Sequence, residues 1–184
     1  SSQHRPFRSL PSIYSVFRRF IKYLYLEKKI QRNLSLLLIP PKVFSQAHIP
    51  HFLSDEELAR LFQKIPNTYP EEIRAQAIIQ LLLFTGLRAG EAAALQLDDI
   101  DWDKKHILVK NRKNGHDLFL VLPDPAIKAI YKYVAKARPN YRLERNIFFT
   151  SHAPITPLTS GSLVMVVRRY FKSHGVQGSA HRLR

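Results

Sequence analysis

The first periodic stretch of the chain covers residues 11–30, where apolar side chains recur every three or four residues. Ile13, Val16, Phe17 and Phe20 fall on one face of a helix, and lysines and arginines fill the opposite face. This spacing predicts an amphipathic helix, because about 3.6 residues complete each helical turn.

Prolines interrupt the next stretch, residues 33–49, which is interpreted as a linker. A new unit begins at Ser54, because Ser54 and Glu57 have the spacing of a capping box, in which each side chain accepts a hydrogen bond from the other residue's backbone N–H. The helix that starts there is expected to end near Lys64.

Four more helices are predicted from apolar periodicity and from capping residues. The first is almost entirely apolar over residues 78–84, so it is expected to be buried, and Gly86 is expected to end it. The last is expected to start at Thr159 or Ser160 and to stop at Gly175. The four helices cover residues 71–84, 88–95, 125–137 and 160–174.

Between the second and third of these helices the pattern changes to short runs of β-forming residues. Three strands are predicted, at Ile100–Asp103, His106–Lys110 and Leu118–Leu122. Asn114 and Gly115 between the last two strands indicate a tight hairpin, because both residues tolerate positive φ. The sequence therefore predicts an α+β fold that is mostly helical and contains a small three-stranded antiparallel sheet.

Charge is the bulk property that adds most to this picture. The chain has 29 lysines and arginines against 14 aspartates and glutamates, a net charge of +15, whereas ~2–8 is enough to keep a small domain soluble. Residues 1–48 and 104–184 are basic and residues 49–103 are acidic. This distribution indicates a polyanionic partner. The sequence has no cysteine, which excludes disulfides and thiolate metal sites, and it has no apolar run of the ~18 residues that a membrane span needs.

Three short segments carry residues suited to phosphate chemistry, namely Thr85–Glu91, Lys113–Gly115 and His181–Arg184. Taken singly, each has a plainer interpretation: a structural ion pair between Arg88 and Glu91, a solvated hairpin lysine, and a surface pair on one helix face. The four aspartates between residues 98 and 103 are interpreted as a solvated edge of a strand and turn rather than as a magnesium site.

Taken together and in this order, the three segments resemble the motifs of the tyrosine recombinase or phage integrase family, which includes the Xer-type chromosome resolution enzymes. The family's first box has the form T-G-L-R-x-x-E, which residues 85–91 fit at every fixed position, and its second has the form H-x-L-R, which residues 181–184 fit. The resemblance covers roughly residues 50–184. It implies that residues 49–184 are the catalytic domain, and that residues 1–48 are the last helix of an N-terminal core-binding domain followed by a linker.

The resemblance also implies a reaction, in which a tyrosine attacks a DNA phosphodiester, forms a 3′-phosphotyrosine linkage and releases a 5′-hydroxyl. Arg88 and Arg184 match the two guanidiniums that bind the non-bridging oxygens, where negative charge grows in the transition state. Lys113 matches the general acid for the leaving 5′-oxygen, and His181 matches a residue that contacts the phosphate and assists proton transfer. Glu91 is expected to hold Arg88 or the adjacent backbone turn. No metal, other cofactor or ATP is expected, because the phosphotyrosine linkage keeps the energy of the broken ester.

The family places its attacking tyrosine after the second box, and none of the eight tyrosines in this sequence occupies that place. We therefore expect the chain as given to bind double-stranded DNA without cutting it. A non-catalytic DNA-binding module derived from a recombinase is the alternative, and an unrelated basic helical protein is a third interpretation. The resemblance further implies a tetramer on paired sites for the complete enzyme, a cytoplasmic and nucleoid-associated location, and neither a membrane nor a small-molecule substrate.

Overall fold

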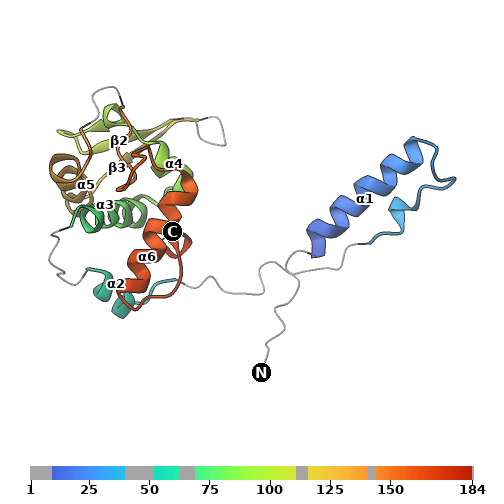
Figure 1. Ribbon diagram of the computed structural model, residues 1–184, viewed down its shortest axis with the longest axis horizontal. Helices are drawn as coiled ribbons and strands as arrows, with labels where there is room; N and C mark the ends of the chain where they lie inside the picture. The colour runs from blue at the N-terminus through green and yellow to red at the C-terminus, as the bar shows by residue number, and fades with distance from the viewer. Residues whose placement is uncertain (1–9, 40–51, 63–68, 111–115, 141–143, 184) are drawn as a thin grey trace. The chain divides into compact units, whose positions relative to one another are not determined.

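The computed structural model describes residues 10–39, 52–62, 69–110, 116–140 and 144–183 (Figure 1). The chain divides into two compact units, residues 1–49 and residues 50–184. Among the helices of the described residues, none is both long enough and apolar enough to cross a membrane.

The first unit consists of helix α1, Leu10–Leu26, and a short 3₁₀ helix η1, Leu34–Leu36. Helix α1 is shorter than predicted, because the chain takes a left-handed turn at Lys28, where φ is 55°. The Arg18 Nε donates a hydrogen bond to the Ser35 carbonyl oxygen over 3.1 Å, which ties η1 to α1. The predicted amphipathic helix is thus present, and its apolar face is exposed within this unit.

The second unit is built around helix α3, Pro70–Thr85, which packs against α4, α5, α6 and η3 (Figure 1). Helix α3 ends where it was predicted to end, at Gly86, whose φ of 62° is left-handed and whose N–H donates to the Leu82 carbonyl oxygen over 2.9 Å. The other helices of the unit are α2 (Asp55–Phe62), α4 (Ala89–Ala94), α5 (Asp124–Lys136), α6 (Ser160–Ser173) and the 3₁₀ helices η2 (Leu97–Asp99) and η3 (Ala180–Leu183).

The predicted capping residues are confirmed at α2 and α6. The Ser54 N–H donates to Glu57 Oε2 over 2.9 Å and the Glu57 N–H donates to Ser54 Oγ over 3.2 Å, so the capping box is complete. At α6 the cap is Thr159 rather than Ser160, because the Thr159 hydroxyl accepts the Ser162 N–H over 3.2 Å. Each cap satisfies a backbone donor that the first helical turn leaves without an intrahelical partner.

The hydrophobic core lies along α3, as the apolar run over residues 78–84 predicted. Ile78, Leu81 and Leu82 are each at most 1% exposed. The prediction is wrong at Phe84, which is 45% exposed. Consecutive residues circle a helix, so an unbroken apolar run places some side chains on the face that no neighbouring element covers.

The three predicted strands are present as β1 (Ile100–Asp101), β2 (His106–Val109) and β3 (Leu118–Val121), which form an antiparallel sheet in that order. Ile107 of β2 pairs with Leu120 of β3. β1 is shorter than predicted because Asp101 accepts the Lys104 N–H over 2.9 Å and so turns the chain. The predicted hairpin residues Asn114 and Gly115 lie outside the described residues. In the view of Figure 1 the sheet is drawn above α3.

Candidate active site

Arg88 stands at the junction between two helices. Helix α3 is closed by Gly86, and Arg88 is the N-cap residue of α4. The intervening Leu87 is 2% exposed, and its N–H donates to Thr85 Oγ1 over 3.4 Å. Because Leu87 anchors the turn in the core, the next side chain points outwards, and the Arg88 side chain is 48% exposed.

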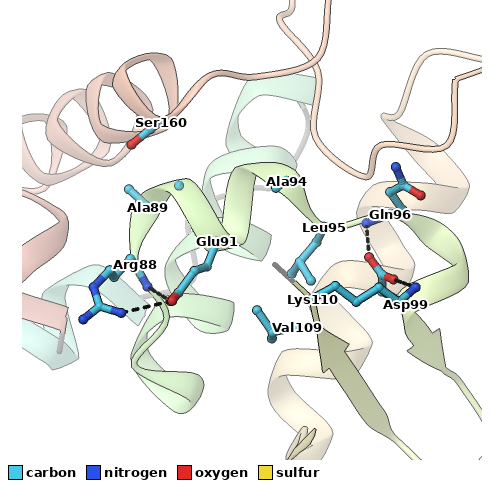
Figure 2. A pocket seen from close by; sticks show the side chains of 11 residues that line it. Arg88, Ala89, Glu91, Ala94, Leu95, Gln96, Asp99, Val109, Lys110 and Ser160 are labelled. Carbon is cyan, nitrogen blue, oxygen red and sulfur yellow. Dashed lines mark hydrogen bonds and ion pairs between the residues drawn. The ribbon is translucent and has the colours of Figure 1, made fainter. Parts of the chain in front are cut away.

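Glu91 holds both the backbone and the side chain of Arg88, which confirms its predicted structural role. Its Oε2 accepts the Arg88 N–H over 2.8 Å, and its Oε1 accepts from Arg88 Nη1 over 3.1 Å (Figure 2). The Glu91 side chain is 12% exposed, so it presents a largely buried carboxylate to a half-exposed guanidinium. One carboxylate therefore fixes the start of α4 and the direction of the guanidinium together.

A pocket of about 650 Å³ extends from Arg88 to the end of β2 (Figure 2). Arg88 and Glu91 line one end, and Asp99 and Lys110 line the other. Ser160, from the first turn of α6, lines the pocket on the Arg88 side. Helix α4 and the sheet thus present two cations, Arg88 and Lys110, to one concave surface.

Asp99 and Lys110 form an ion pair that the sequence interpretation did not foresee. Asp99 is 8% exposed, accepts the Gln96 N–H over 2.9 Å, and accepts from Lys110 Nζ over 2.6 Å. The interpretation of a solvated aspartate edge is therefore wrong at this position. A hydrogen bond to the Asp99 carboxylate, together with its charge, raises the pKa of Lys110, so this cation stays protonated at neutral pH.

Two of the four predicted site residues, Lys113 and Arg184, lie outside the described residues. His181 lies in η3 and is exposed, and its Nε2 is 3.2 Å from the Ser179 hydroxyl. Although η3 packs against α3 and α6, His181 does not line the pocket that Arg88 lines. Of the two predicted site residues that the structure describes, Arg88 lines the pocket, and His181 is exposed on the surface outside it.

The segment that carries His181 is anchored by the residue after it. Arg182 donates to the two carboxylate oxygens of Glu57 over 3.0 and 2.6 Å, and to the Phe52 carbonyl oxygen over 2.7 Å. Leu183 is 3% exposed and joins the core. Arg182 and Leu183 are the two middle positions of the H-x-L-R box. Arg182 therefore anchors η3 to Glu57 of α2, 125 positions earlier in the chain, and Leu183 anchors η3 to the core.

No tyrosine among the described residues lines the pocket beside Arg88. Tyr170 is 6% exposed, and its hydroxyl donates to the Leu61 carbonyl oxygen over 3.1 Å and accepts from Gln76 Nε2 over 3.2 Å. Tyr133 is 1% exposed, and its hydroxyl accepts the Phe149 N–H over 3.2 Å. Burial raises the pKa of both phenols. These two groups are structural.

Comparison with known proteins finds similarity to integrases and tyrosine recombinases. The family model described as "Phage integrase family" matches residues 51–184. Tyrosine recombinase XerC of Pelotomaculum thermopropionicum is 33% identical over 125 residues, which cover 68% of this chain and 40% of that protein. Tyrosine recombinase XerC of Bacillus pumilus is 28% identical over 180 residues, which cover 95% of this chain and 57% of that protein.

The fold matches solved structures as well. A lambda integrase dimer bound to a COC′ core site superposes with a TM-score of 0.66 at 17% identity, covering 94% of this chain and 60% of that chain. This likeness confirms the predicted fold, a mostly helical domain with a small three-stranded antiparallel sheet. The chain spans about two fifths of the length of several curated relatives and less than three fifths of others.

Proposed function

The chain belongs to the phage integrase family, and from this premise we propose that it serves site-specific DNA recombination by tyrosine-mediated transesterification. The observation that carries the proposal is Arg88, whose backbone and guanidinium are both held by Glu91 while about half of the side chain remains exposed beside a pocket. A guanidinium that is fixed in direction and open to solvent can bind a phosphodiester without first having to reorganise.

Arg88 suits the oxygens of the scissile phosphate, because its planar fork donates two hydrogen bonds to them and stays charged at any physiological pH. In the proposed reaction Arg184 binds the same phosphate, Lys113 protonates the leaving 5′-oxygen, and His181 assists proton transfer from the attacking tyrosine. The roles of these three residues rest on the match of their sequence segments to the family's motifs. The phosphotyrosine bond conserves the energy of the ester, so the reaction is proposed to need neither metal nor ATP.

The polypeptide of 184 residues is itself proposed to bind double-stranded DNA without cleaving it. Its net charge of +15 supplies the attraction to a polyanion, and no tyrosine of its described part lies beside Arg88. The complete enzyme is proposed to act in the cytoplasm as a tetramer on paired sites. The alternative is a non-catalytic module derived from a recombinase, which would bind DNA in the same way and would not cleave it in any form of the protein.

The test uses the full-length protein and a nicked copy of its DNA site, so that the cleaved strand end diffuses away and the covalent protein–DNA complex accumulates. We expect Arg88→Lys to reduce the rate of complex formation by about 100-fold, because a lysine cannot reproduce the paired hydrogen bonds of the guanidinium. Lys113→Ala should be equally slow on normal DNA. A 5′-thiol leaving group should restore its rate, since a thiolate leaves without a proton.

Two results would contradict the proposal in different ways. If the full-length protein binds the site and never forms a covalent complex, the protein is a binding module. If the complex forms and the 5′-thiol fails to rescue Lys113→Ala, the recombinase assignment stands and the general-acid role of Lys113 falls. The equilibrium affinity of each variant for intact DNA serves as the control for folding and binding.

A further inference from the structure

A second pocket, of about 760 Å³, lies between α6 and the loop that precedes it. The ionisable side chains that line it in the described part of the chain are all basic, namely Arg74, His152 and Arg169. Five hydroxyl side chains accompany them, those of Thr150, Ser151, Thr156, Thr159 and Ser162. The Thr150 hydroxyl donates to the Pro154 carbonyl oxygen over 3.0 Å, and the Thr159 and Ser162 hydroxyls are hydrogen-bonded to each other over 3.0 Å. Cations and hydroxyl groups without a carboxylate form a lining that suits an anion and repels a cation.

Arg74 is the most unusual member of this lining, because it is a buried cation near the start of helix α3. It is 9% exposed, and its Nη1 donates to the Phe149 carbonyl oxygen over 2.6 Å. Its Nε is buried and has no hydrogen-bond partner, and within the described residues no carboxylate pairs with it at ion-pair distance. Burial, with the nearby positive charge of Arg169, lowers the pKa of Arg74 against the opposing effects of Tyr133 and Glu71. An anion in the pocket would offset this unfavourable burial.

The start of α6 adds a further donor group to the same pocket. Gly161 and Ser162 line it, and Thr159 caps the helix. The first turn of this 14-residue helix contains no acidic residue, so the positive end of the helix dipole is not neutralised locally.

Two carboxylates lie nearby, and their position limits where an anion can sit. Glu71 and Glu72 line an adjoining hollow together with Arg74 and Arg169, on the side of Tyr170 and Ser173 further along α6. Neither glutamate lines the pocket of hydroxyl groups. Glu71 also lines a smaller hollow with Arg74, Thr150 and Ser151. The region suited to an anion is therefore the pocket that Arg74 and Arg169 share with the hydroxyl groups, which neither glutamate lines.

We propose that this pocket binds a backbone phosphate of the DNA, separate from the phosphate that Arg88 binds. The proposal rests on the proposed function and adds a second contact to it. The first turn of α6 links the two sites, because Ser160 lines the Arg88 pocket (Figure 2) and Gly161 and Ser162 line this one. Phosphates follow each other along one DNA strand at about 3.4 Å of helix axis, so a single duplex can present different phosphates to both sides of the turn.

The test compares two neighbouring arginines of α6 in the 184-residue chain. Both are exposed, and Arg169 lines the pocket whereas Arg168 does not. Arg169→Gln and Arg168→Gln remove the same charge, so any effect of net charge is matched. The affinity for a labelled duplex is measured by fluorescence anisotropy at several salt concentrations, and thermal unfolding shows that each variant is folded.

We expect Arg169→Gln to weaken DNA binding by about 10-fold and to reduce the slope of log affinity against log salt by about 0.9, the value for one lost phosphate contact. Arg168→Gln should produce less than half of either change. Equal effects of the two variants, or no effect of Arg169→Gln, would overturn the inference while leaving DNA binding itself intact. Failure of the unaltered chain to bind DNA would instead count against the proposed function.

The phosphate group in the pocket could belong to DNA or to a small phosphorylated molecule, and a titration with inorganic phosphate distinguishes the two. The Nε–H resonance of Arg74, observed by nitrogen-edited NMR, should shift on addition of the duplex and should shift weakly with millimolar phosphate. A saturable shift with phosphate alone, and none with DNA, would assign the pocket to a small phosphorylated molecule and so overturn the choice of DNA. No shift with either probe would overturn the site.

Discussion

Arg88 and Arg74 show how the same side chain takes two different roles in one domain. Arg88 is about half exposed and is aligned by the Glu91 carboxylate. Arg74 is 9% exposed, and its Nη1 donates a hydrogen bond to a backbone oxygen, that of Phe149. An exposed guanidinium with a carboxylate beside it is inexpensive to keep charged, whereas a buried one without a carboxylate is costly. The first is suited to the scissile phosphate, and the second is suited to the further backbone phosphate proposed for its pocket.

At the residue scale, Glu91→Ala should loosen the residue that we place on the scissile phosphate. The substitution removes the acceptor of the Arg88 N–H and the partner of its Nη1, so we expect a loss of about 1 kcal/mol in the free energy of unfolding and a fall of about 100-fold in covalent complex formation by the full-length protein. Glu91→Gln, which keeps one acceptor oxygen, is the matched variant and should lose less of both. Equal activity of Glu91→Ala and the unaltered protein would show that Arg88 needs no support.

Among the elements, the short helix α4 is placed both by its ends and by its buried alanines Ala92 and Ala93, since it packs against α6 and α3. Gly86 closes α3 in the left-handed region, Leu87 enters the core, and Glu91 caps the first turn. A helix of this length has little intrinsic stability, since nucleation is unfavourable. Its position, and with it the direction of Arg88, therefore depends on the turn at Gly86.

Gly86→Ala should destabilise the domain by about 1 kcal/mol, because alanine is strained at positive φ. A Cβ at Gly86 would have no heavy atom within 4 Å, so the effect reports backbone strain alone. Gly90→Ala is the control in the same region: its Cβ would lie 3.8 Å from Ser160, an ordinary contact, and within a helix it should be neutral or stabilising by up to about 1 kcal/mol. Urea unfolding of the two variants measures both effects. A Gly86→Ala domain as stable as the unaltered one would mean that the turn has another conformation.

The contact between α2 and η3 should make the stability of the domain depend on pH. A hydrogen bond from Arg182, reinforced by the Ser54 N–H, lowers the pKa of Glu57 in the folded state. A carboxyl whose pKa is lower when folded contributes its stability above the unfolded pKa, about 4.3, and loses it as the pH falls through the folded value. We expect the free energy of unfolding to fall as the pH is lowered below about 5. Arg182→Gln should make this fall smaller, and an unchanged pH profile would contradict the assigned contact.

For the whole molecule, the distribution of charge and the distribution of core residues divide the chain differently. The buried apolar residues belong to residues 50–184, whereas basic residues are concentrated both in residues 1–48 and in residues 104–184. We propose that residues 1–48 add DNA affinity as the end of a core-binding domain and its linker. Removal of residues 1–48 is therefore expected to lower the affinity for DNA and to leave the stability of the remaining domain unchanged.

A polypeptide of residues 50–184 should fold alone, because the hydrophobic cluster is contained within it. We expect one cooperative urea transition, followed by far-ultraviolet circular dichroism, with the same midpoint as the corresponding transition of the 184-residue chain. Its affinity for duplex DNA should be lower and less dependent on salt, because nine basic residues are removed with residues 1–48. An unfolded fragment, or one with undiminished affinity, would contradict this division of roles.

Local patterns in the sequence were sufficient to predict the helices and strands and several of their ends. Helical periodicity located α3 and α6, and side-chain chemistry located the caps at Ser54 and Thr159, because these interactions join residues within one or two helical turns. The motif around Arg88 likewise predicted that Glu91 would support it. Errors at the ends of α1 and β1, and at Phe84, arose where a turn or an uncovered face overrode the pattern.

The amino-acid sequence was enough to identify the residues suited to phosphate chemistry and the segments that form helices or strands. The surroundings of those residues depend on how the elements pack against one another. Asp99 meets Lys110, Arg182 meets Glu57 and Arg74 meets Phe149 across 11, 125 and 75 positions of the chain. Burial and electrostatic environment arise from such long-range contacts, which leave no periodic trace in the sequence. For that reason Arg74 of α3 became a candidate anion ligand only once the elements were packed together.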